Sequence, residues 1–123
     1  MILCLKGFRV LDFTVKNHIA PSTSVKLNTT LNHKVNFNEN KKTAVCCTTV
    51  EVRAEKSVDF LVSIILESAF TYDEDDKKAV HLSSYKAIYP TLKEIVKAAT
   101  KSLHMNPLDL PDINLPESSI HSN

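Results

Sequence analysis

The apolar residues of this 123-residue chain change their spacing once, near residue 73, and this change constrains the fold more than any other feature. Before it, apolar and polar residues alternate along four stretches, which is typical of strands with one buried face. After it, apolar residues recur every three or four positions, the spacing of one helix face. The sequence therefore predicts an α+β domain in which the sheet precedes the helical layer.

Four strands are expected, over residues 8–20, 25–37, 43–54 and 58–72, separated by turns at 38–41 and 55–57. Asparagine in the first turn tolerates the left-handed backbone that a tight hairpin needs. Hairpin connections between consecutive strands would give a four-stranded antiparallel sheet. In the first strand we place four residues on one face, and near Thr48 the pattern predicts a bulge. Those four residues are Arg9, Leu11, Phe13 and Val15.

The second half predicts a short helical segment over 76–87 and one long C-terminal amphipathic helix that begins at Pro90. The acids at 73–76 suit the start of a helix, because carboxylates accept its first backbone N–H groups. After the helix, the prolines in residues 106–116 favour extended backbone that packs along a surface. We expect a single domain over residues 1–115 and a flexible tail over 116–123.

Charge and glycine content exclude several classes of function. The chain has 15 basic and 14 acidic residues, so no positive surface for nucleic acid is expected. Gly7 is its one glycine, whereas a phosphate-binding loop needs several. No apolar run approaches the roughly 20 residues that cross a bilayer, and the apolar start Met1–Leu5 is too short for a signal peptide. We therefore expect a cytoplasmic protein without a membrane segment.

Residues that could carry chemistry are dispersed along the chain. Cys46 and Cys47 are strand neighbours that point to opposite faces, so reduced thiols are expected. The five histidines lack the close spacing of metal ligands, and we expect them at the surface. No nucleophile motif is visible. The sequence predicts no metal, no cofactor and no enzymatic activity, although a pocket between helix and sheet with a small ligand stays open as an alternative.

Two motifs flank the long helix. Tyr85–Pro90 ends in an aromatic-proline step, and Pro107–Leu115 alternates prolines, leucines and acids before an asparagine. Together with the Ala20-Pro21 step and four preceding strands, they resemble the SecB family of protein-export chaperones. The resemblance covers roughly residues 7–115, and its terminal motif is the more specific part.

The resemblance implies an ATP-independent chaperone, a holdase, that binds unfolded or nascent polypeptides in apolar grooves. It also implies a homo-oligomer, either a dimer or a dimer of dimers, and pairing between subunits would cover exposed sheet edges. Apolar walls bind non-native chains without a sequence code. The residues expected to form the client-binding surface are Phe13, Val25, Leu27, Tyr85, Ile88, Tyr89, Leu108 and Leu110.

The chain also departs from the family pattern. The export chaperones carry an acidic sheet face that meets the SecA motor, and the aligned positions here are Val15, Ile19 and Ser63. Glu67-Ser68 replaces a usual glycine pair, and Leu103 or a neighbour replaces a helix-ending glycine. Docking to SecA is therefore not favoured. An alternative is a dedicated interaction subunit of the same fold that serves one partner, for example an antitoxin, without a role in export.

Overall fold

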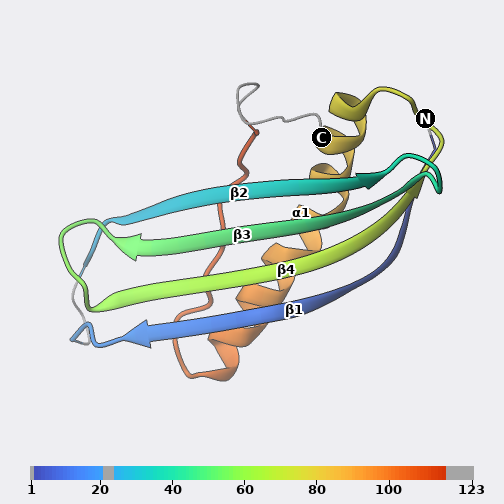
Figure 1. The fold of residues 1–123 in the computed structure, drawn as a ribbon. Coiled ribbons are helices and arrows are strands. Elements are labelled where there is room, and N and C mark those ends of the chain that lie inside the picture. The colour runs from blue at the N-terminus through green and yellow to red at the C-terminus, as the bar shows by residue number, and fades with distance from the viewer. Residues whose placement is uncertain (1, 21–23, 116–123) are drawn as a thin grey trace.

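The computed structural model describes residues 2–20 and 24–115, so the predicted flexible tail lies outside the described residues. The described chain folds into strands β1 (Leu3–Asn17), β2 (Leu27–Asn38), β3 (Thr43–Ala54) and β4 (Phe60–Tyr72), followed by helix α1 (Lys77–Ser102). The strands form one antiparallel four-stranded sheet, and α1 crosses one of its faces, here named the covered face (Figure 1). The predicted α+β fold class is confirmed.

The strand order is β1-β4-β3-β2, so the expected hairpin between the first two strands is wrong. Strands β2, β3 and β4 follow one another through turns, whereas β1 pairs with β4 on the far side, as in a Greek key. This order places β4, the most apolar strand, between two neighbours. Strands β1 and β2 therefore form the two opposite edges of the sheet (Figure 1).

Two register shifts in β1 decide which of its side chains meet the helical layer. Bulges lie between Leu5 and Gly7 and between Val10 and Asp12. Each bulge adds one residue, which switches the following side chains to the other face. Arg9 pairs with Glu67 and therefore does not share a face with Phe13, so that prediction is wrong, and Leu11 is the unpaired residue of the second bulge. The residues of β1 that pair with buried residues of β4 are all apolar: Leu3, Leu5, Phe8, Val10, Phe13 and Val15.

The core lies between the sheet and α1. Every second residue of β3 from Ala44 to Ala54 is buried, and so is every second residue of β4 from Val62 to Tyr72. On α1, the buried stripe includes Val80, Ile88, Leu92 and Val96. The predicted bulge near Thr48 is wrong, because β3 pairs with both neighbours without a shift.

Helix α1 is continuous, so the prediction of a separate helical segment before Pro90 is wrong. A proline inside a helix leaves the carbonyl four residues earlier without its N–H donor. That residue is Lys86, which lies on the exposed side of α1, where water can satisfy the carbonyl. The Asp76 carboxylate caps the helix by accepting the N–H groups of Lys78 and Ala79, as the acidic run predicts.

The helix ends without glycine. The N–H of His104 donates to the carbonyl of Lys101, and the N–H of Met105 donates to that of Thr100. This pair of bonds defines a Schellman motif, whose left-handed position is usually glycine. Here His104 occupies it with φ 58°. The other non-glycine residue with positive φ is Lys42, at 51°, so the left-handed residue of the first turn is not one of its asparagines.

We predict that His104→Gly stabilises the protein by about 1 kcal/mol, because glycine adopts the left-handed backbone without the Cβ clash. Urea unfolding monitored by circular dichroism measures the change. Lys101→Gly is the matched control, one turn earlier on exposed regular helix, where glycine should destabilise by roughly 0.5–1 kcal/mol. An equal loss in both variants would contradict the cap assignment.

Candidate functional site

Residues 106–115, here named the C-terminal segment, turn back beside α1 and cross the covered face of the sheet (Figure 1). Leu110 is fully buried, and three further apolar residues of the segment pack against the core at partial exposure. Those three are Leu108, Ile113 and Leu115. The covered face thus has two covering elements, α1 and the C-terminal segment.

Two tyrosines of α1 hold the backbone of the C-terminal segment. The Tyr85 hydroxyl donates to the carbonyl of Ile113, and the Tyr89 hydroxyl donates to that of Pro111. The two rings lie next to each other, with centroids 5.1 Å apart. Burial raises the pKa of both hydroxyls, so they remain protonated donors at neutral pH.

Polar contacts continue along the same side of the helix. The Lys93 ammonium lies 2.8 Å from the Asp112 carboxylate. The Thr100 hydroxyl oxygen accepts the N–H of Leu108 at 2.9 Å. The ion pair is exposed on its acidic side and contributes at most about 1 kcal/mol. The buried Thr100 hydroxyl does more than the ion pair to position the C-terminal segment, because it fixes the point where the segment leaves the helix.

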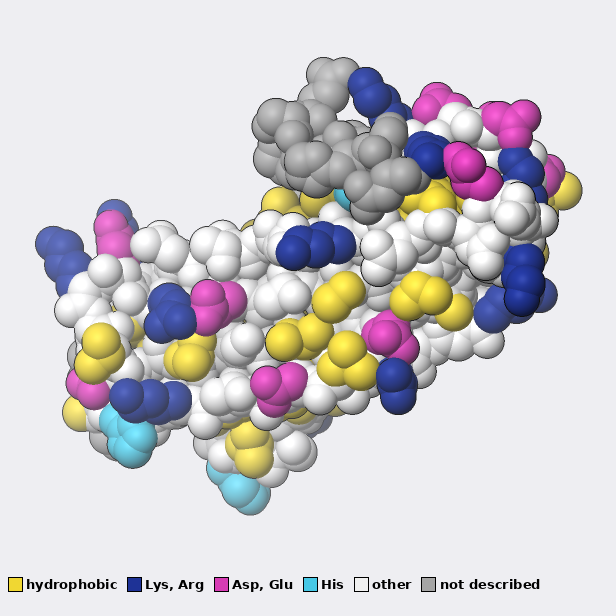
Figure 2. All heavy atoms as spheres, in the orientation of Figure 1, with side chains coloured by type: hydrophobic (Ala, Val, Ile, Leu, Met, Phe, Trp, Pro, Cys, Tyr) yellow, Lys and Arg dark blue, Asp and Glu magenta, His cyan; other side chains and the backbone are white. Residues whose placement is uncertain are grey.

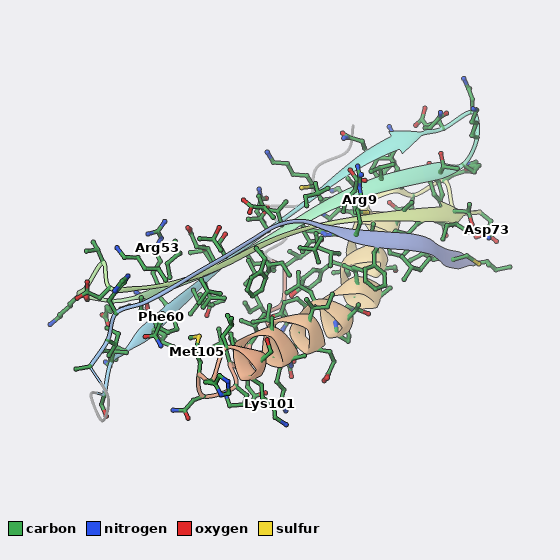
Figure 3. The ribbon with its side chains drawn as sticks, turned by 90° about the horizontal axis from the view of Figure 1, so that it is seen from below. Arg9, Arg53, Phe60, Asp73, Lys101 and Met105 are labelled. Carbon is green, nitrogen blue, oxygen red and sulfur yellow. The ribbon has the colours of Figure 1, made fainter. Side chains whose placement is uncertain are left out.

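A groove of about 300 Å³, here named the end groove, opens where the sheet extends past the end of α1. Four parts of the chain meet there: the residues after β1, the start of β2, the start of β4 and the residues after α1. Figure 3 shows Phe60 and Met105 close to each other on this side of the sheet, opposite to Arg9 and Arg53. The lining residues are Asn17, Ile19, Ala20, Val25, Leu27, Phe60, Met105, Asn106, Pro107 and Leu108.

The described residues that line the end groove can bind apolar groups, but they include no side chain that could act as an acid or a base. None of its ten lining residues is titratable, and only the amides of Asn17 and Asn106 can form side-chain hydrogen bonds. A neighbouring hollow of about 540 Å³ shares Val25 and is bordered by the charged residues Lys26, Glu55 and Lys56. Within residues 2–20 and 24–115, no cluster of three His, Cys, Asp or Glu side chains could hold a metal ion.

Three of the eight residues expected to bind clients line the end groove. Val25 and Leu27 are each 39% exposed, and Leu108 is half-buried beside them. Phe13 is half-buried on the covered side of β1 and packs against the core, away from the groove. The other four are buried: Tyr85, Ile88 and Tyr89 on α1, and Leu110 in the C-terminal segment itself. The segment would have to move before a client could reach the two tyrosines that hold it, and a role in binding stays a prediction for all eight.

The sequence analysis did not select Ile19, Phe60 and Met105, which complete the end groove. Ile19 and Met105 lie just beyond the end of an element, where no periodicity applies, and Phe60 is the first residue of β4. Only the convergence of the four chain segments makes them neighbours. The sequence did contain one indication of this role: Ile19 and Met105 are large apolar residues in the connections between elements.

A second apolar surface runs along β1. Leu5, Phe8 and Val10 point to the covered side, yet they are 40%, 48% and 42% exposed. Helix α1 crosses the sheet obliquely and passes behind β1 only with its C-terminal half (Figure 1), while these three side chains stay partly exposed. In the sheet formed by residues 3–72, β1 has no strand on its outer side. An open strand edge beside apolar side chains favours pairing with another chain.

The face of the sheet opposite α1, here named the open face, mixes apolar side chains with charges of both signs (Figure 2). Arg9 lies 3.0 Å from Glu67, and Arg53 lies 2.6 Å from Glu51. Of the three positions aligned with the acidic docking face, Ser63 lies on the open face, whereas Val15 packs toward the core and Ile19 lines the end groove. On the open face, Glu51 and Glu67 are thus each paired with an arginine.

The sequence matches no protein-family model and no curated protein. Among solved structures, the fold is similar to the SecB-like chaperone Rv1957 of Mycobacterium tuberculosis in complex with a ChAD peptide from the Rv1956 HigA1 antitoxin. The TM-score is 0.70 at 16% identity, covering 91% of this chain and 88% of that chain. A protein of unknown function from Streptococcus agalactiae has a TM-score of 0.49 at 11% identity, covering 91% of this chain and 98% of that chain. The fold of this chain is SecB-like.

We predict that the double substitution Tyr85→Phe, Tyr89→Phe loosens the C-terminal segment, because both backbone carbonyls lose their hydroxyl donors. The expected loss is about 1–3 kcal/mol of unfolding free energy, together with faster proteolysis within residues 106–115. Urea unfolding and limited proteolysis measure the two effects. Tyr72→Phe, a buried tyrosine outside this contact, is the control. Unchanged proteolysis in the double variant would mean that apolar packing alone holds the segment.

Proposed function

We propose that this protein is an ATP-independent chaperone that holds unfolded or nascent polypeptides by their apolar segments. The observation that carries the proposal is the end groove, an open apolar surface built from four chain segments on a SecB-like fold. A groove without titratable groups suits many different client sequences, because apolar contact has no directional requirement. We expect no enzymatic activity and no nucleotide requirement.

The energetics of such binding need no external source. A client that buries about 200–300 Å² of apolar surface gains roughly 5–8 kcal/mol at about 25 cal/mol per Å². Ordering of the client and loss of its translational freedom oppose this gain by several kcal/mol. The balance is weak and reversible binding, which allows a holdase to release its client.

A second candidate function is a dedicated subunit that binds one partner. It is supported by the structurally similar chaperone, whose complex contains a peptide from an antitoxin. A role in export has less support, because Glu51 and Glu67 on the open face are each paired with an arginine. The free thiols at Cys4, Cys46 and Cys47 suit a reducing compartment, so we propose a cytoplasmic location.

We also propose that the protein forms a homo-oligomer through β1. Antiparallel pairing of two β1 strands across a two-fold axis would satisfy the outer edge of each sheet. The same contact would bury Leu5, Phe8 and Val10, which a monomer leaves 40–48% exposed. Further association of two such dimers would have to use the open face or the outer side of α1, because the β1 edges would already be paired.

We predict that Leu27→Asn weakens client binding about tenfold, since one buried leucine contributes on the order of 1.5 kcal/mol. The client is a reduced and alkylated protein that cannot refold, and light scattering on a sizing column measures the bound mass. Val45→Asn is the matched control, because Val45 is similarly exposed, at 44% compared with 39%, but lies on the open face.

The same assay separates the two candidate functions. Several unrelated unfolded chains should compete with one another for a general holdase. A protein that ignores all of them would instead be a dedicated subunit. Equal weakening by Leu27→Asn and Val45→Asn would remove the end groove as the binding surface.

We predict that the double substitution Phe8→Asp, Val10→Asp converts the oligomer to monomers at micromolar concentration, because carboxylates would be buried at the β1 contact. Light scattering gives the mass. Val45→Asp on the open face serves as the control and should keep the mass of the dimer. A wild-type protein that is monomeric at this concentration would refute the β1 contact.

A further inference from the structure

Two histidines lie buried at the opposite half of the covered face from the end groove, against the expectation that all five are at the surface. His33 on β2 is 2% exposed and His81 on α1 is 1% exposed. The His33 ring contacts Thr48 Oγ1 through Nδ1 at 2.8 Å and Ser84 Oγ through Nε2 at 3.0 Å. One imidazole therefore connects β2, β3 and the N-terminal half of α1.

The hydrogen bonds determine which ring nitrogen of His33 carries the proton. The Ser84 hydroxyl donates its single hydrogen to the carbonyl of His81 at 2.9 Å. Its oxygen can then only accept from the ring, so Nε2 is the N–H donor. Nδ1 of the neutral ring must accept, and the donor is the Thr48 hydroxyl. A second proton on Nδ1 would make this nitrogen a donor. The Thr48 hydroxyl could then no longer donate to it and would lose its acceptor.

Among residues 2–20 and 24–115, the groups around the His33 ring are neutral or lower its pKa. The His81 ring meets the His33 ring edge-on, with centroids 5.2 Å apart, and the Tyr85 ring lies 5.6 Å away. Strand β3 adds the Cys46 thiol, whose pKa burial raises, and β4 adds the Ser68 hydroxyl beside that thiol. From the C-terminal segment, the Asp112 carboxylate acts on the neighbouring Tyr85 and lies in an ion pair with an α1 lysine.

We propose that this buried cluster is an acid-sensitive latch: with a neutral His33 ring it closes α1 onto β2 and β3, and protonation of His33 releases the N-terminal half of α1 from the sheet. The latch consists of His33, Thr48, His81 and Ser84. It does not depend on the proposed binding of polypeptides, and its opening would expose apolar residues of α1 such as Val80 and Ile88.

The direction and range of the pH dependence follow from linkage. Burial, and secondly the neighbouring His81, lower the pKa of His33 to about 3 in the closed state. In an open state a solvated histidine has a pKa of about 6.5. The closed state is therefore fully favoured above about pH 6.5 and loses stability as the pH falls toward 3. At pH 5 the ratio of open to closed molecules should rise about thirtyfold.

Hydrogen exchange at pH 7.5 and pH 5, corrected for the intrinsic rates, tests the latch. In the wild type, protection of the amides in residues 80–89 should fall about thirtyfold, while those of β3 and β4 keep their protection. His33→Gln should remove most of the fall, because glutamine can bond to both hydroxyls without titrating. His18→Gln, at an exposed histidine, should behave like the wild type.

An equal fall in His33→Gln, a uniform loss of protection that includes β3 and β4, or no fall at all would each overturn the proposal. If His33→Gln does not fold, the imidazole signals of the wild type decide by nuclear magnetic resonance. A neutral His33 ring at pH 5 in the closed protein, with the proton on Nε2, supports the latch. A ring that titrates near pH 6.5 in the closed protein excludes it.

Discussion

The organisation of this molecule depends on one constraint: a single helix must cover the apolar face of a sheet that is larger than the helix. The 26 residues of α1 span about 39 Å, whereas the 15 residues of β1 span about 50 Å. The rest of the covered face must be filled by another part of the chain or remain open. The C-terminal segment fills part of it, and the end groove and the β1 edge are what remains.

The buried polar cluster complements this arrangement by fixing how α1 lies on the sheet. Apolar contacts alone would tolerate small rotations of a helix, because they have no preferred direction. A rotation here would separate Ser84 from His33 and leave buried polar groups unsatisfied, at about 1–3 kcal/mol each. The position of α1 in turn fixes Tyr85 and Tyr89, which place the C-terminal segment beside the end groove.

Regular elements could be predicted from sequence wherever one face is continuously buried. Strand β3 was predicted with its correct ends, since its alternation is unbroken from Ala44 to Ala54. In β1 the two bulges interrupt the alternation of buried and exposed side chains. A single two-residue period along the whole strand placed Arg9 and Leu11 on the face of Phe13, although Arg9 lies on the other face and Leu11 is the unpaired bulge residue. The spacing of Leu3 and Leu5, Phe8 and Val10, then Phe13 and Val15 contains both shifts, but their meaning appears only once β4 is the neighbour.

The site was harder to predict than the fold, because exposure depends on which layer lies above a residue. Tyr85 and Leu108 come from the two motifs that suggested the client-binding surface, yet Tyr85 is buried and Leu108 lines the end groove. The histidines show the same limit, since His33 alternates like its apolar neighbours and its partner Ser84 is 51 residues away. Local patterns give the face of an element but not the long-range contact that covers it.

The small size of the end groove connects the proposed oligomer with the proposed binding. A groove of about 300 Å³ accommodates only a few side chains, so one subunit alone would bind an unfolded chain weakly. An unfolded chain has many apolar segments, and two grooves on one dimer can bind two of them. The second segment then binds at an effective concentration in the millimolar range, which raises the overall affinity without any new contact. A folded protein presents few extended apolar segments and gains nothing from the second groove. Selectivity for non-native chains would thus arise from the number of weak sites and not from the strength of any single one.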